Sequence, residues 1–316
     1  MPIAPPSGAA SELTANPSPA PLHPSPETAT MEVVPSEQQP PLPYQPVTGK
    51  PWRLTMGLRP LPRHAWLEVD QHRERELTAK GDLLATTPDV VIGVAPGSDA
   101  AQRELETAII DDLAEHHGLE VHSVARVDDA PIVRAARLVQ EDLCLFERRG
   151  GTWEMTAACV CFPSRWTLSE KVGQNLSALH GPVPGYAEAL GGPVEALFNR
   201  LHPDRPVWRL NWTILDTNEL HLPTPAARRG LHLPDDLSTM TFRIERQTLR
   251  TLPETGAICF TIRTYAAPLG ELLADQPALA VDLAATLRTV DVEMATYKGW
   301  ADLLPSLIAW LESPSG

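Results

Sequence analysis

Residues 241–265, TFRIERQTLRTLPETGAICFTIRTY, contain two stretches in which polar and apolar residues alternate. Successive side chains of a β-strand point to opposite faces, so an alternation of period two predicts a strand. The interruption Pro-Glu-Thr before Gly256 is typical of a hairpin turn. These residues therefore predict two antiparallel strands, and VWRLNWTIL at 207–215 predicts a third strand before them.

Helical patterns lie on both sides of these strands. Leu105, Ile109 and Leu113 recur at helical spacing before Gly118, and residues 167–180 predict another helix, which ends at a Gly/Pro run. Between them, two further strands are predicted to turn at Arg149-Gly150-Gly151. Helical stretches follow again near the C-terminus. Because strands run together and helices stand before and after them, the sequence predicts an α+β fold with an antiparallel sheet.

Composition limits the class of partner and the compartment. The formal net charge of −14 disfavours binding to DNA or RNA, whose phosphates would repel the chain. Four cysteines in 316 residues do not predict a disulfide framework, so we expect a cytoplasmic protein with free thiols. No apolar run is long enough for a membrane span, and no signal peptide is expected.

Two regions differ in composition. Residues 1–50 contain 13 prolines and few large apolar side chains, which predicts a disordered tail with polyproline II character. Residues 51–316 are predicted to form the folded domain, with helical extensions at both of its ends.

The predicted strands carry an unusual set of polar side chains. Alternation places Arg243, Glu245 and Gln247 on one face of their strand, with Arg246 on the other, and it places Arg263 and Tyr265 together on the next strand. We expect the hairpin to bring these arginines, the glutamate and the tyrosine onto one sheet face. Two readings stay open: a solvated face with cross-strand ion pairs, or the polar wall of a pocket.

Several strings together resemble one family. They are QEDLCLFER, CFPSRW, LHGPVPGY, RLNWTI, FRIERQTLRTLPETGAICFTIRTYAAPL and YKGW, spread over about residues 50–300. They resemble the α subunits of haem-dependent oxidative N-demethylases. The resemblance implies a PAS-like fold, in which an antiparallel sheet and flanking helices enclose a haem b pocket. It also implies NADPH-driven oxidation of a small secondary amine such as dimethylamine by O2, giving formaldehyde and a primary amine. Flavin, iron–sulfur and folate chemistry would then belong to partner subunits, including a reductase.

His180 has two interpretations. From the residues alone it is either a structural histidine at a helix end or a ligand. The resemblance implies that it binds the haem iron, because the axial histidine of a haem PAS domain comes from a helix beside the sheet. A neutral imidazole would bind through one nitrogen, while the other would need a fixed acceptor such as a backbone carbonyl.

The resemblance also suggests roles for other side chains. Those expected to line the side where oxygen and amine react are Arg243, Glu245, Arg263 and Tyr265. Those expected to contact the haem, including its propionates, are Arg165, Lys171, Arg246 and Asn211. Two alternatives remain: a haem-based gas or small-ligand sensor without turnover, and an α+β domain that binds no haem.

Overall fold

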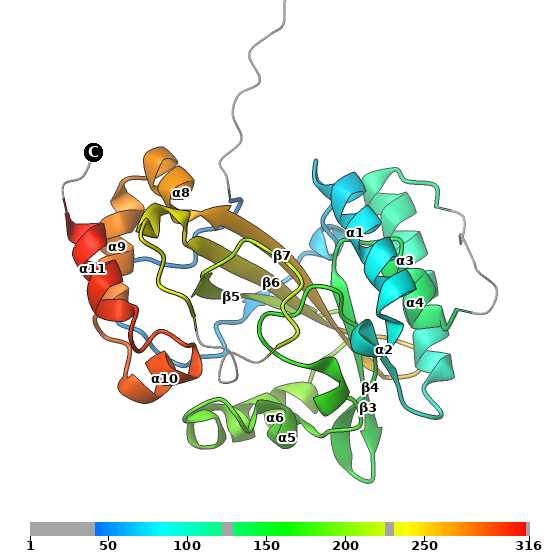
Figure 1. Ribbon diagram of the computed structural model, residues 1–316. Coiled ribbons are helices and arrows are strands. Elements are labelled where there is room, and N and C mark those ends of the chain that lie inside the picture. Colours follow the sequence, from blue (N-terminus) through cyan, green and yellow to red (C-terminus); the bar gives the residue numbers. More distant parts are fainter. Residues whose placement is uncertain (1–41, 122–128, 225–230, 314–316) are drawn as a thin grey trace, which may run out of the picture. The chain divides into compact units, whose positions relative to one another are not determined.

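The computed structural model describes residues 42–121, 129–224 and 231–313 (Figure 1). Its sheet has seven strands in the order β1-β5-β6-β7-β3-β4-β2, and every neighbouring pair is antiparallel. The strands are β1 (Arg59–Pro60), β2 (Ile92–Val94), β3 (Asp142–Arg149), β4 (Thr152–Cys159), β5 (Val207–Leu215), β6 (Thr241–Thr251) and β7 (Ile258–Pro268). The predicted α+β class with an antiparallel sheet is confirmed.

The β6–β7 hairpin forms where the alternation predicted it. Thr251 pairs with Ile258, and Gly256 in the turn between them has a φ of +71°, which favours glycine. The register continues through the pair Arg246–Arg263 to the far end of both strands.

This register overturns one expectation. Because Arg246 lies opposite Arg263, the side chains of Arg263 and Tyr265 share a face with Arg246 and point away from the face of Arg243 and Glu245. We call the face with Glu245 the cavity face and the face with Arg263 the core face. The expectation that Arg243, Glu245, Arg263 and Tyr265 form one wall is therefore wrong.

The core face is covered by two groups of helices (Figure 1). Near β3 and β4 they are α1 (Arg73–Thr86), α2 (Pro88–Val91), α3 (Asp99–His117) and α4 (Pro131–Ala136). Near β5 and β6 they are α8 (Leu269–Asp275), α9 (Ala278–Leu287), α10 (Val292–Tyr297) and α11 (Leu304–Glu312). None of the helices in these ranges is both long and apolar enough to cross a bilayer.

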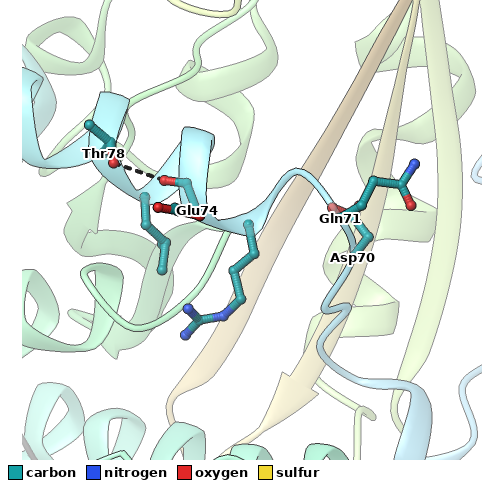
Figure 2. A pocket seen from close by; sticks show the side chains of 6 residues that line it. Asp70, Gln71, Glu74 and Thr78 are labelled. Carbon is teal, nitrogen blue, oxygen red and sulfur yellow. Dashed lines mark hydrogen bonds between the residues drawn. The ribbon is translucent and has the colours of Figure 1, made fainter. Parts of the chain in front are cut away.

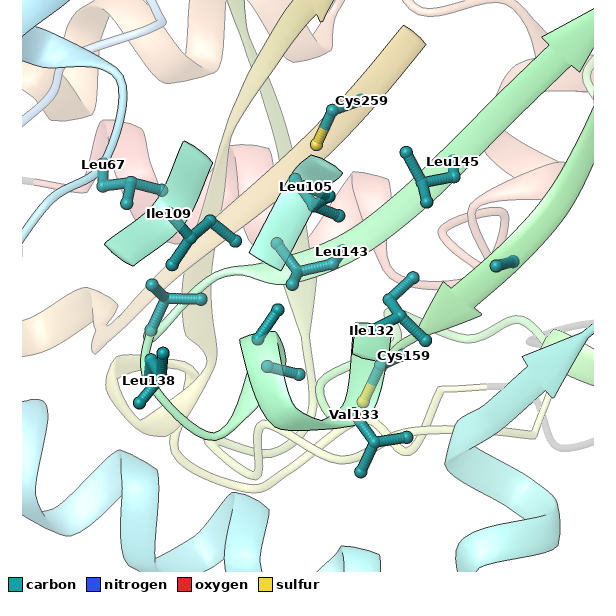
Figure 3. Close-up of a cluster of buried hydrophobic side chains, with 14 of the residues drawn as sticks. Leu67, Leu105, Ile109, Ile132, Val133, Leu138, Leu143, Leu145, Cys159 and Cys259 are labelled. Atoms are coloured by element: carbon teal, nitrogen blue, oxygen red, sulfur yellow. The ribbon is translucent and has the colours of Figure 1, made fainter. Parts of the chain in front are cut away.

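The first group of helices packs against the sheet in an apolar core. Leu105 and Ile109 of α3 and Ile132 of α4 pack against Leu143 of β3 and Cys259 of β7 (Figure 3). All five side chains are buried. The cysteines in this cluster behave as small apolar groups, as the apolar composition of their strands predicted.

The segment between β4 and β5 lies against the cavity face. It contains η2 (Leu168–Glu170), α5 (Leu176–His180), η3 (Ala187–Gly191) and α6 (Gly192–Phe198). The single helix predicted for 167–180 is therefore wrong in its middle, since Gly173 adopts a φ of +83° and Asn175 starts a new helix by accepting from the Ala178 N–H. His180 still ends that helix, as predicted.

Of the predicted proline-rich tail, residues 1–41 lie outside the described residues. Residues 42–50 lie inside them, and Leu42 and Val47 are buried in the cluster formed by β5, β6 and the C-terminal helices. The chain then runs through Trp52 toward β1 and contributes to the cavity described next.

Candidate functional site

A cavity of about 1370 Å³ lies between the cavity face of the sheet, the segment of α5–α6, residues 46–59 and α10. Small-molecule sites usually have volumes of about 300–1,000 Å³, so this cavity has room for a large cofactor together with a small substrate. Much of its wall is apolar. The apolar residues that line it include Phe146, Met155, Leu176, Leu179, Val183, Val194, Leu197, Phe198, Leu249, Phe260 and Ile262.

His180 lines this cavity and is held by two contacts. Its Nδ1 lies 2.8 Å from the carbonyl oxygen of Leu176, one turn earlier in α5. Its ring stacks on Tyr186, with 4.3 Å between ring centroids and 8° between planes. The Gly/Pro turn between His180 and Tyr186 reverses the chain direction and brings the two rings into contact. Gly185 in this turn has a φ of +71°.

These contacts fix the chemical state of the imidazole. Burial lowers the pKa of His180, against the hydrogen bond to Leu176, so the ring is neutral near pH 7. A neutral ring whose Nδ1 faces a carbonyl oxygen carries its proton there. The lone pair then lies on Nε2, which makes no hydrogen bond to any described residue. A metal ligand needs this state.

Two arginines on the cavity wall have unsatisfied nitrogens. The Nε atoms of Arg165 and Arg209 are buried and find no partner among the described residues. Arg165 is also paired with Asp216 at 2.6 Å, whereas burial lowers the pKa of Arg209 despite the attraction of Glu245. Unpaired guanidinium N–H groups beside an apolar cavity suit a ligand that carries carboxylates.

Arg165 has a further unusual property. Its φ is +63°, and among the described residues other than glycine it alone has a positive φ. Its backbone N–H donates to Leu222, which fixes the loop after β4 against the loop after β5. Such a conformation is held by its surroundings and is often found at functional sites.

Lys171 and Asn211, which were predicted to contact the haem, line the same cavity as His180. The ammonium of Lys171 donates to the Leu179 carbonyl at 2.6 Å, and burial lowers its pKa. Lys171 therefore holds the end of α5 beside His180. Asn211 lies on β5 and donates to Glu245.

Glu245 is the acidic group at the centre of the cavity face. Its Oε2 accepts hydrogen bonds from Asn211 at 3.2 Å and from Gln247 at 3.0 Å. Its Oε1 lies 3.7 Å from Nε of Arg243 and can accept a further donor. The side chain of Glu245 is only 10% exposed, so a cation in the cavity would meet its carboxylate with little competition from water.

The side chains of Arg243 and Arg246, which were also predicted to belong to the site, do not line the cavity. Arg243 is on the cavity face but is buried behind it, where it donates to the carbonyls of Phe162 and Leu220. Arg246, on the core face, donates to the backbone carbonyls of Ala65 and Trp66. Neither arginine lines the cavity, which corrects the expectation for Arg246 as a haem contact.

Arg263 and Tyr265 also lie away from the cavity. Arg263 is fully buried and pairs with Asp70 at 2.6 Å and Glu76 at 2.8 Å. Tyr265 donates to Glu68 at 2.9 Å. Both side chains contribute to the packing between the core face and the start of α1.

Sequence reasoning missed three cavity residues: Tyr186, Trp52 and Lys298. It placed Arg209 on the polar face with Asn211 but gave it no contact with the haem. Arg209 alternates with Asn211 on the same strand, so the period of two contained its signal. Trp52 and Lys298 are far apart in the chain, and no local pattern could bring them together.

The described residues contain no group of three or more histidine, cysteine or acidic side chains that could hold a metal ion directly. A haem needs only one axial histidine from the protein, so this finding does not bear on His180. A second hollow, of about 580 Å³, lies on the surface at the start of α1 beside Asp70, Gln71, Glu74 and Thr78 (Figure 2). It shares no residue with the large cavity.

A neutral oriented imidazole, largely apolar walls and two arginines whose Nε atoms have no partner among the described residues are features that fit a protein binding an iron porphyrin. A family model described as haem-dependent oxidative N-demethylase, alpha subunit-like, matches residues 57–308. The chain belongs to this family, which confirms the resemblance seen in the sequence. The matched range contains His180, Glu245, Arg165, Arg209 and Lys298.

Proposed function

We propose that this protein binds haem b through Nε2 of His180 and oxidatively demethylates a small secondary alkylamine, such as dimethylamine, with O2. Electrons would come from a reductase partner. The observation that carries the proposal is the state of His180. Its Nδ1 lies against the Leu176 carbonyl, while its Nε2 makes no hydrogen bond to any described residue, and the side chain lines a largely apolar cavity of about 1370 Å³.

The residues present fit the cofactor. The apolar side chains of α5, α6 and the cavity face would contact the porphyrin. Arg165 and Arg209 would pair with its propionates, and the Nε–H groups of both have no partner among the described residues. When bound, haem supplies the iron at which O2 is reduced. Stacking on Tyr186 would keep the imidazole oriented while the cofactor enters and leaves.

Glu245 would bind the substrate. A secondary alkylamine is protonated near neutral pH, and Oε1 of Glu245 can accept one of its N–H groups. The two amide donors on Oε2 keep the carboxylate in place, so that the substrate nitrogen is oriented without reorganisation of the site. The same carboxylate can take the proton that the amine must lose before its oxidation.

Two features support the PAS-like part of the proposal. The core is an antiparallel sheet, and the helical segment that carries the predicted axial histidine is inserted between β4 and β5 and lies over one sheet face. The family description contains the words alpha subunit-like, which supports the existence of partner subunits. That those subunits would hold the flavin, iron–sulfur and folate chemistry is part of the proposal.

The first test is spectroscopic. We expect the purified protein to show a Soret band, and His180→Gly to lose most of its bound haem or to change its axial-ligand spectrum. Added imidazole should restore that spectrum, because it can occupy the space left by the side chain. His202→Ala is the matched control, since His202 is exposed and outside the cavity.

Turnover is tested separately by amine-dependent O2 consumption and formaldehyde release in the presence of an electron donor. An amine-induced spectral shift without product would point instead to a haem-based sensor. A His180→Gly protein with an unchanged haem spectrum would exclude this histidine as the iron ligand.

A further inference from the structure

The wall of the large cavity is rich in positive charge, in contrast to the molecule as a whole. Among the described residues that line it, seven are lysine or arginine and three are glutamate, whereas the whole chain has a formal net charge of −14. The two propionates of a haem would not offset this excess, even if Arg165 is left out because it pairs with Asp216. The cavity wall therefore suits a further anionic group.

Lys298 supplies one of these charges, at the outer edge of β5. Its Nζ donates to the Trp212 carbonyl at 3.1 Å and lies 5.2 Å from the ring centroid of Trp52 and 4.9 Å from that of Trp300. A carbonyl oxygen and the faces of two aromatic rings all favour the charged ammonium. An ammonium has three N–H donors, and the described residues provide a hydrogen-bond acceptor for one of them. The remaining donors are left for a ligand.

The carboxylate of Glu245 is anchored at the neighbouring residue of the same strand. Asn211 of β5 donates to Oε2 of Glu245 at 3.2 Å, and Trp212, the next residue, accepts from Lys298. The two charges act on each other, yet no hydrogen bond or ion pair joins them within the described part of the chain. Both side chains line the cavity. Its wall thus holds an anion and a cation that are close but not paired.

We propose that the amine bound here is an N-methylated amino acid, whose ammonium is bound by Glu245 and whose carboxylate is bound by Lys298. This inference rests on the proposed function, since it assigns a class of substrate to the same site. In an α-amino acid one carbon atom separates the nitrogen from the carboxylate, so a single small molecule can contact both wall charges. N-methylglycine is the smallest member of the class and differs from dimethylamine by one carboxylate group.

The charges of the wall favour this class over simpler ligands. A simple alkylammonium is attracted by Glu245 but lies near the positive charges of Lys298 and Arg209, which act on the same part of the cavity. A simple carboxylate is attracted by those cations but repelled by Glu245. A zwitterion gains at both of its ends. Lys298 is therefore a specificity-determining residue, which selects amines that carry a carboxylate.

The experiment measures binding, by isothermal titration calorimetry on the full-length protein as purified, at pH 7. N-methylglycine is compared with N-methylglycinamide, which keeps the secondary amine but replaces the carboxylate by a neutral amide. Hydrogen bonds between two charged groups are stronger than those to a neutral acceptor, so we expect N-methylglycine to bind about tenfold more tightly. Equal affinities for the two compounds would overturn the proposal.

Lys298→Met removes the charge with little change in side-chain length. The variant should bind N-methylglycine about tenfold more weakly and N-methylglycinamide no more weakly than the unaltered protein. Lys50→Met is the control, because Lys50 is an exposed lysine of the same cavity wall, and both affinities should stay within about twofold. If Lys298→Met does not fold, the two compounds compared on the unaltered protein still decide. A variant that loses haem but keeps its affinity for N-methylglycine would assign Lys298 to the cofactor and overturn the proposal.

The proposed function can fail separately from this inference. A protein that oxidises dimethylamine but binds N-methylglycine no more tightly than its amide keeps the proposed function and loses the inference. A protein that prefers N-methylglycine, through Lys298, but oxidises no amine loses the proposed function and keeps the class of bound ligand.

Discussion

Arg263 illustrates how a buried charge can be structural although its sequence context suggests a site. Its guanidinium is fully buried between Asp70 and Glu76, on the opposite sheet face from the cavity. Removing one partner of such a group leaves the others buried without compensation, which typically lowers the free energy of unfolding by about 3–5 kcal/mol.

We therefore predict that Arg263→Met is strongly destabilised in urea unfolding, while the fraction that folds keeps the haem spectrum of the unaltered protein. Arg288→Met is the control, because Arg288 pairs with Glu312 at the surface and its loss should change stability by less than about 1 kcal/mol. A well-folded Arg263→Met protein with an altered haem spectrum would contradict this assignment.

The alternation of residues within each strand was predicted correctly, but the relation between the two strands was not. Period two shows that Arg243 and Glu245 share a face, and separately that Arg263 and Tyr265 do. Whether these two pairs of side chains lie on the same face of the sheet depends on the number of residues in the turn. One residue more or less in the turn would move the second pair to the other face. The turn closes with Thr251 opposite Ile258, a detail that the string TLPETGA leaves open.

At the scale of elements, the least predictable part was the segment that carries His180. The apolar spacing of Leu168, Val172, Leu176 and Leu179 suggests one continuous helix, yet Gly173 and Asn175 divide it. The division turns Lys171 back so that its ammonium reaches the carbonyl of Leu179. A hydrogen bond of this kind depends on tertiary packing, which outweighs local helical propensity here.

The short edge strand β2 positions the same segment through a close contact. A methyl group added at Gly93 would lie 2.4 Å from Cγ2 of Val172, which is closer than real carbon atoms approach. Gly93→Ala must therefore displace the segment around Val172, and we predict a loss of about 1–3 kcal/mol in the free energy of unfolding.

The double variant Gly93→Ala/Val172→Ala should recover part of this loss, because it removes the clashing methyl groups. Gly81→Ala is a control of opposite sign: it lies in α1 with no atom near the added methyl group, and alanine stabilises a helix by about 0.5–1 kcal/mol relative to glycine. Additive effects of the two changes in the double variant would show that Gly93 and Val172 do not interact.

At the scale of the whole molecule, the order of strands and helices was predictable because each element carries its own periodicity. Residues 207–215 form a strand as predicted, and residues 99–117 form a helix that stops at Gly118. The cavity was not predictable from periodicity, since its walls come from residues 46–59, α5–α6, β5–β7 and α10. Only the family resemblance connected these distant segments with haem chemistry.

The stability of the whole fold should depend on pH through one buried carboxyl group. Glu141 is fully buried beside the Arg263 cluster; its Oε1 accepts the Glu68 N–H at 2.9 Å, and its Oε2 has no partner among the described residues. Burial raises the pKa of Glu141 to about 7, although Arg263 lowers it. The folded protein thus binds this proton more tightly than the unfolded chain does.

Because the folded protein binds the proton more tightly, we predict that the contribution of Glu141 to stability falls as the pH rises from about 4.5 to about 7 and is constant above that range. At 1.36 kcal/mol per pKa unit, the total change in the free energy of unfolding is at most about 3 kcal/mol. Glu141→Gln keeps an acceptor for the Glu68 N–H but does not titrate. The variant should therefore be more stable than the unaltered protein at pH 8 in urea unfolding, and the difference should vanish near pH 5. Glu271→Gln, at an exposed position of α8, should show no such pH-dependent difference. Equal destabilisation of Glu141→Gln at both pH values would contradict this prediction. It would mean that the carboxyl group is ionised in the folded protein at both pH values, although none of its contacts explains such a charge.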